Sequence, residues 1–150
     1  MRNPIMEDAV GRGTFPQVSP IPILLLENNP GEVLRFKQIL SADKRREVFT
    51  IVHLSRLEIA ANYLAGRPEG PMVIITSLFL PDSRGLEIVR RLRESGPDSV
   101  VVALYQIRDR AVMGSLLAAG ADLCLDRDLL ARDFEQTIRH LIGHSAQSEG

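Results

Sequence analysis

Polar side chains follow several of the apolar runs in this chain, and together they could form one chemical site. The residues are Glu27, Asn28, Ser77, Tyr105 and Arg127. One carboxylate beside an amide and a hydroxyl is a poor cage for Mg²⁺, which prefers charged oxygens in octahedral geometry, so we expect no metal or other cofactor. A serine hydroxyl is a nucleophile only when a base activates it, and the sequence places no base near Ser77. We therefore expect no enzymatic activity.

Strands and helices that alternate along the chain must position these residues. Short runs rich in Val, Ile and Leu predict strands over 23–26, 48–53, 72–76, 100–104 and 123–125. Apolar residues at three- and four-residue spacing predict five helices after these strands, the last of them over 128–140. This alternation is typical of an α/β protein whose parallel sheet is covered by helices on both faces.

Capping residues predict where the helices begin and end. Asn29 and Asp109 are good N-caps for the first and fourth helices. Glu32 stands three residues after Asn29, and Glu58 stands three after Ser55, so both pairs predict a capping box. Three helices end at glycines, namely Gly66, Gly96 and Gly120.

Right-handed crossovers leave few arrangements for five strand–helix units. We expect a doubly wound, flavodoxin-like α/β fold with five helices and a five-stranded parallel sheet in the order 2-1-3-4-5. In such a fold the functional crevice lies beyond the carboxyl ends of the strands, where strands 1 and 3 diverge. Since the polar residues named above follow strand ends, the fold would gather them in that crevice.

The length of 150 residues is typical of one domain, which we expect over 21–142. Residues 1–20 contain glycines and prolines without regular apolar spacing, and they predict a flexible N-terminal arm. Residues 143–150 predict a polar C-terminal tail.

Charge and composition exclude several classes of partner. The formal net charge of −1 gives no field that would hold the chain on nucleic acid, and we interpret Arg90, Arg91 and Arg93 as a solvated face. No apolar run approaches the roughly 18–20 residues that span a bilayer, so we expect no membrane partner. The single cysteine, Cys124, cannot form an internal disulfide, and we expect a cytoplasmic protein.

Four segments of the predicted domain resemble the CheY-like receiver domains of two-component response regulators. The resemblance covers Pro22 to Ile142, and the segments are Ile23–Pro30, Leu78–Glu87, Ala118–Asp122 and Leu125–Arg127. They are similar to the strand that ends in an acidic pair, the loop after the phospho-accepting aspartate, the end of the fourth helix, and the fifth strand with its lysine.

The resemblance implies a phosphorylation pocket whose residues have been replaced. The phospho-accepting aspartate corresponds to Ser77, and the acidic pair is reduced to Glu27 with Asn28. Tyr105 stands where the family has a Ser or Thr, and Arg127 stands where it has a lysine. We therefore interpret the chain as a stand-alone degenerate receiver, or pseudo-receiver, that acts in signal transduction by protein–protein interaction without aspartyl phosphorylation.

Three further expectations follow from these replacements. Because arginine binds a carboxylate in two-point fashion, we predict an ion pair between Arg127 and Glu27 across the mouth of the sheet. Cys124 occupies the family's switch position, where an aromatic residue is common, and we interpret it as a buried hydrophobic residue. Ser77 would end its strand and hydrogen-bond to the loop that follows.

The family also implies a protein partner, such as a histidine kinase or another signalling protein, and a possible homodimer through helix 4, strand 5 and helix 5. Residues of this chain on that face would include Arg110, Met113, Leu117, Asp128, Arg132, Asp133 and Arg139.

Two alternatives remain open. A phosphorelay receiver could use Asp82 as an unusual acceptor, although this residue lies five positions beyond the strand end. A small flavodoxin-like enzyme or ligand-binding domain could use the crevice around Ser77, although the chain has no glycine-rich phosphate loop.

Overall fold

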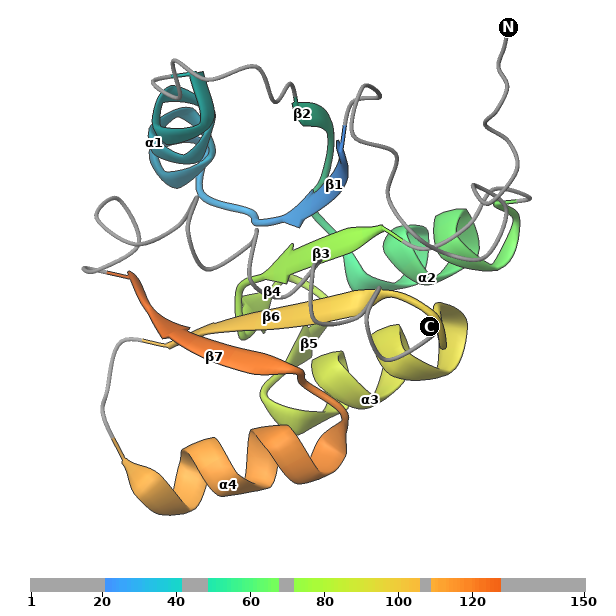
Figure 1. Cartoon of the computed structure of the whole chain (residues 1–150), viewed down its shortest axis with the longest axis vertical. Helices are drawn as coiled ribbons and strands as arrows, with labels where there is room; N and C mark the ends of the chain where they lie inside the picture. Colours follow the sequence, from blue (N-terminus) through green and yellow to red (C-terminus); the bar gives the residue numbers. More distant parts are fainter. Residues whose placement is uncertain (1–20, 42–48, 68–71, 106–108, 128–150) are drawn as a thin grey trace, which may run out of the picture.

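A computed structural model describes residues 21–41, 49–67, 72–105 and 109–127 of the chain. In this part, five parallel strands form one sheet in the order β2-β1-β3-β6-β7 (Figure 1). Along the chain these are the first to fifth strands of the sheet, so the order 2-1-3-4-5 and the flavodoxin-like fold are confirmed.

The elements match the predicted runs closely. The strands of the main sheet are β1 (Ile21–Leu26), β2 (Phe49–Leu54), β3 (Val73–Thr76), β6 (Val100–Tyr105) and β7 (Leu123–Asp126). The helices are α1 (Pro30–Ser41), α2 (Leu57–Ala65), α3 (Leu86–Ser95) and α4 (Arg110–Ala119). The predicted fifth helix over 128–140, the arm over 1–20 and the tail over 143–150 lie outside the described residues. In the described part, no helix combines the length and apolarity needed to cross a bilayer.

Helices cover both faces of the sheet, as Figure 1 shows. On one face Ile23 and Leu25 of β1 pack with Phe36 of α1. On the other, Leu24 and Leu26 pack in the core beneath α2, α3 and α4. Successive side chains of a strand point to opposite faces, and burial of both faces explains why the strands read as continuous apolar runs.

The N-caps were predicted correctly, but the capping boxes were wrong. The Asn29 side chain accepts the N–H groups of Gly31 and Glu32 at 2.8 and 3.2 Å, and Asp109 caps α4 in the same way. The Glu32 carboxylate instead binds Arg127. The Glu58 carboxylate binds Arg91 of α3 at 3.0 Å, so neither glutamate completes a capping box.

A two-stranded hairpin in the β3–α3 connection was not predicted. Its strands are β4 (Phe79–Leu80) and β5 (Ser83–Arg84), paired antiparallel, and Asp82 lies in the turn between them. The Asp82 carboxylate accepts the N–H groups of Leu57 and Glu58 at 2.9 and 3.0 Å, so the hairpin supplies the cap for α2. Desolvation raises the pKa of Asp82, but these hydrogen bonds outweigh it and hold the pKa below its ordinary value.

Arg93 joins α3 to the end of α4, which corrects its interpretation as part of a solvated cluster. Its guanidinium donates to the carbonyl of Gly120 at 2.8 and 3.1 Å, and it pairs with Asp122 at 2.6 Å. It also donates to the carbonyl of Ser99 at 2.7 Å. Gly120 has a φ of +127°, and a Cβ there would lie 2.9 Å from the Cβ of Arg93, so only glycine fits this approach.

Candidate functional site

The carboxyl ends of the strands gather the predicted polar residues around one pocket. It has a volume of about 760 Å³, and its lining includes all five of the predicted residues: Glu27, Asn28, Ser77, Tyr105 and Arg127. β1, β3, β6 and β7 are parallel and adjacent in pairs, so the residues that follow them share one edge of the sheet. Cys124 is half-buried on β7 and packs against the core beneath α2, α3 and α4.

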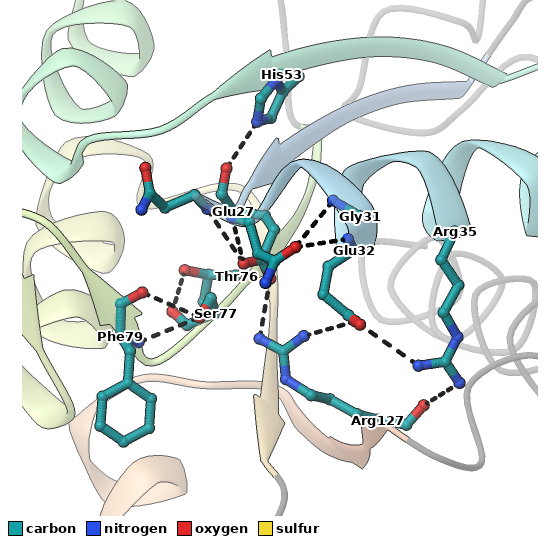
Figure 2. Close-up of polar contacts among 11 residues, drawn as sticks. Glu27, Gly31, Glu32, Arg35, His53, Thr76, Ser77, Phe79 and Arg127 are labelled. Atoms are coloured by element: carbon teal, nitrogen blue, oxygen red, sulfur yellow. Dashed lines mark hydrogen bonds and ion pairs between the residues drawn. The ribbon is translucent and has the colours of Figure 1, made fainter.

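The predicted ion pair between Arg127 and Glu27 is present. One guanidinium nitrogen lies 2.9 Å from Oε1 of Glu27, and the two side chains are only 9% and 5% exposed (Figure 2). The other carboxylate oxygen of Glu27 accepts the N–H groups of Asn28 and Asn29, each at 3.1 Å. Both oxygens of this buried carboxylate are therefore bonded to the chain itself.

Two residues of α1 complete the site and were not predicted to belong to it. A second nitrogen of Arg127 lies 3.0 Å from Glu32, which also lies 3.6 Å from Arg35. Arg35 donates to the carbonyl of Arg127 at 3.2 Å, as Figure 2 shows. Glu32 stands in the first turn of the helix after β1, and the first turn faces the carboxyl edge of the sheet. The position of Glu32 in this first turn is the feature of the sequence that could have placed it in the site.

His53 also contacts the site from β2. Its Nε2 lies 2.7 Å from the backbone carbonyl of Glu27, so this nitrogen carries the proton and donates the hydrogen bond. The contact ties the end of β2 to the residue that pairs with Arg127, and nothing in the local sequence around His53 indicates it.

Ser77 ends β3 and hydrogen-bonds to the following loop, as predicted. Its hydroxyl accepts the N–H of Phe79 at 3.1 Å and lies 3.3 Å from the carbonyl of the same residue. The side chain is buried, and no base among the described residues contacts the hydroxyl. This arrangement does not activate a serine nucleophile.

The donor set of the pocket does not fit Mg²⁺. Glu27 is the one carboxylate at the end of β1, and its oxygens already accept Arg127 and two backbone N–H groups. Ser77 adds a neutral oxygen that is bonded to the loop. No group of three or more candidate metal ligands occurs among the residues that the structure describes. The guanidinium of Arg127 supplies the positive charge beside Glu27.

Cys124 is less buried than predicted. It lies on β7, the edge strand of the described sheet, where it is half-buried, and desolvation raises the pKa of its thiol. The thiol is therefore protonated at neutral pH and behaves as a small apolar group.

The predicted interaction face lies partly within the described residues. On α4, Arg110 is exposed, Leu117 is 48% exposed and Met113 is half-buried. The other predicted members, Asp128, Arg132, Asp133 and Arg139, lie outside the described residues.

Several solved structures that are similar to this chain are receiver domains. The signal receiver domain of an HD domain-containing protein from Pseudomonas fluorescens Pf-5 is 19% identical, with a TM-score of 0.72, 86% of this chain and 91% of that chain being covered. A CheY-like receiver domain protein from Methanospirillum hungatei JF-1 is 17% identical, with a TM-score of 0.72 and coverage of 88% and 100%. The receiver domain of a sensor histidine kinase from Pseudomonas aeruginosa PAO1, which has a magnesium ion coordinated in its active site cleft, is 19% identical, with a TM-score of 0.68 and coverage of 83% and 99%.

No protein-family model matches the chain, and no curated protein matches it. Sequence identities below 20% with these three structures show a shared fold only, so the chemistry is argued from the residues of the site. The chain has the fold of the CheY-like receiver domains of response regulators.

Proposed function

We propose that this chain is a degenerate receiver that acts in signal transduction by protein–protein interaction, without aspartyl phosphorylation. The observation that carries the proposal is the Arg127 guanidinium, bonded to both Glu27 and Glu32 at the carboxyl edge of the sheet. These contacts occupy the carboxylates that would otherwise be available to a cation. Ser77, at the end of β3, adds no negative charge and no activated nucleophile.

The contacts of Asp82 argue against the alternative acceptor. Both of its carboxylate oxygens accept backbone N–H groups at the start of α2. Attack on a phosphodonor would require this carboxylate to leave the helix that it caps. It also lies outside the lining of the pocket that contains Glu27.

The proposed partner is a protein, such as a histidine kinase or another signalling protein, or a second copy of this chain. Support comes from the receiver fold, since the similar structures include receiver domains of histidine kinases from two organisms. The exposed apolar side chains of α4 are consistent with a contact surface on that helix. For the homodimer, the proposed face is α4, β7 and the segment that follows β7.

A phosphodonor tests the proposal directly. The full chain is incubated with acetyl phosphate and Mg²⁺, and intact mass and backbone amide shifts are measured. We expect no gain in mass and no shift of the amides around the pocket. A receiver domain that has the acceptor aspartate, treated in parallel, controls for the donor. A gain in mass that hydroxylamine removes would refute the proposal, since acyl phosphates are cleaved by hydroxylamine.

The double variant Ser77→Asp/Arg127→Lys separates loss of the acceptor from loss of the scaffold. It restores an aspartate after β3 and a compact ammonium after β7, and it frees Glu27 from the guanidinium. Phosphorylation of this variant but not of the native chain would show that the replacements at these two positions account for the loss.

A further inference from the structure

The pocket at the carboxyl edge of the sheet is large and mostly apolar for a site that would bind only a phosphoryl group. Its volume of about 760 Å³ lies in the range of about 300–1,000 Å³ that is usual for pockets of small organic ligands. Apolar and aromatic side chains form much of its lining: Leu78, Phe79, Leu104, Tyr105 and Val112.

Most charged groups that line the pocket are already paired. Arg127 binds both Glu27 and Glu32, and the Asp109 carboxylate accepts backbone N–H groups at the start of α4. Arg84 on β5 is exposed, and its side chain makes no ion pair or hydrogen bond within the described part of the chain. Among the described residues, the pocket lining therefore has one exposed guanidinium without a partner, that of Arg84, and one carboxylate without a cationic partner, that of Asp109.

An aromatic residue lies directly across the hairpin from this guanidinium. Phe79 and Arg84 are partners in the antiparallel register of β4 and β5. Directly opposed residues of two strands lie on the same face with their Cβ atoms about 4.5–5.5 Å apart. Phe79 is 69% exposed, an unusual exposure for phenylalanine, although it borders the pocket.

We infer that this pocket binds a small organic acid, with an aromatic or aliphatic body against Phe79 and Val112 and a carboxylate paired with Arg84. A guanidinium binds a carboxylate through two parallel hydrogen bonds, and an apolar body removes the exposed phenyl ring from water. Tyr105 also lines the pocket, and its hydroxyl makes no hydrogen bond among the described residues. The inference rests on the proposed function, since a ligand here would take the place of the phosphoryl group as the signal.

Binding can be measured with 2-naphthylacetate, which has a bicyclic aromatic body and one carboxylate. The isotope-labelled full chain is titrated without Mg²⁺ or phosphodonor, and backbone amide shifts are followed. We expect saturable shifts at Phe79, Arg84, Tyr105 and Val112, with a dissociation constant of about 1 mM or below. 2-Naphthylacetamide, which lacks the charge, should bind about three- to tenfold more weakly, and acetate, which lacks the body, should cause no saturable shift.

Two variants and a matched control locate the contacts. Arg84→Gln should weaken 2-naphthylacetate about three- to tenfold and leave the amide analogue unchanged. Phe79→Ala should weaken both compounds. Arg90→Gln removes an exposed arginine of α3 outside the pocket lining and should leave both affinities at the native value.

Equal affinity for the acid and the amide, or shifts confined to other parts of the chain, would overturn the inference. Native amide spectra of the free variants show that a loss of binding does not come from unfolding. The phosphodonor experiment is independent of this one. Absent phosphorylation with no binding would refute the ligand site alone, whereas phosphorylation of the native chain would refute the proposed function.

Discussion

Arg127 lies at the centre of the site, where it bridges Glu27 and Glu32 at 2.9 and 3.0 Å. Its planar fork presents two donors in fixed directions, so one side chain can hold two carboxylates that belong to different elements. A lysine, with one compact charge, would not reproduce both contacts in this geometry. The residue type at this strand end therefore decides whether Glu27 and Glu32 are bonded within the chain.

Removal of Arg127 should destabilise the fold strongly. Arg127→Gln leaves the Glu27 carboxylate buried without its partner, and breaking a buried pair in this way typically costs about 3–5 kcal/mol. Urea unfolding at pH 7 measures the change in the free energy of unfolding. Arg35→Gln is the control, because Arg35 is 39% exposed and its loss should cost about 1 kcal/mol or less. A similar small cost for Arg127→Gln would contradict a structural role for the pair.

At the scale of elements, the hairpin β4–β5 and helix α2 depend on each other. Asp82 reaches from the hairpin turn to the first N–H groups of α2, which no residue of the helix itself caps with its side chain. A helix begins with N–H groups that lack partners, and a carboxylate there also interacts favourably with the helix dipole. The loop that borders the pocket is thus fixed from outside it.

Asp82→Ala should destabilise the protein by about 1 kcal/mol at pH 7, the usual cost of a lost N-cap. The pKa of Asp82 is lower in the folded state, so its contribution is present above the unfolded-state pKa of about 3.9 and is lost as pH falls through the folded-state value. Denaturation of both proteins from pH 7 down to pH 2.5 checks this. The difference should shrink in acid, and the exposed-carboxylate variant Asp98→Ala should show no comparable difference.

Helices α3 and α4 are joined by Arg93. Arg93→Gln removes the contacts with Gly120, Ser99 and Asp122 together and leaves a helix-terminal carbonyl without its donor. We expect a loss of about 2–3 kcal/mol, since hydrogen bonds to charged groups are each worth about 1.5–3 kcal/mol.

Arg90→Gln, on the same helix, is the matched control for Arg93. Arg90 is 56% exposed and lies 4.0 Å from Glu87, so its change should stay within about 0.5 kcal/mol. Thermal unfolding of the two variants, measured in parallel, compares their midpoints. Equal midpoints would show that the contacts of Arg93 add nothing to stability.

At the scale of the whole molecule, different helices pack on the two faces of the sheet. α2, α3 and α4 lie over one face, and α1 lies over the other (Figure 1). α4 presents Val112 and Leu117, which are 44% and 48% exposed. Val112 lines the pocket, whereas Leu117 belongs to the proposed dimer face, where a two-fold contact would pair each copy with the same surface of the other.

Sedimentation velocity tests that contact. If α4 forms the dimer, the native chain should sediment as two copies, and Leu117→Glu should sediment as one because it places a charge in an apolar contact. Ile59→Glu is the control, since Ile59 is 52% exposed on α2, outside the proposed face. A native chain that stays monomeric at concentrations of about 1 mM would refute the dimer.

The fold and the five pocket residues could be predicted from local patterns. Strand and helix spacing, with right-handed crossovers, leads to the observed sheet order, and parallel strands bring Glu27, Ser77 and Arg127 to one edge. The Arg127–Glu27 pair followed because an arginine and a lone carboxylate were the charges left at that edge.

Other contacts between distant segments could not be predicted from local patterns. Ser55 and Glu58 have the spacing of a capping box, yet the cap of α2 is Asp82, and Glu58 pairs with Arg91. The two partners of each contact are far apart along the chain, so no local spacing relates them.

The sequence by itself determined the order of the strands, the edge of the sheet at which polar residues meet, and the serine, Ser77, that follows β3. Only the tertiary structure decided that Arg127 would also hold Glu32 and that Arg84 and Phe79 would be paired across the hairpin at the pocket. The physical reason is that propensity and periodicity act over a few residues. Ion pairs and caps depend instead on which side chains the packed helices and loops bring within a few ångströms.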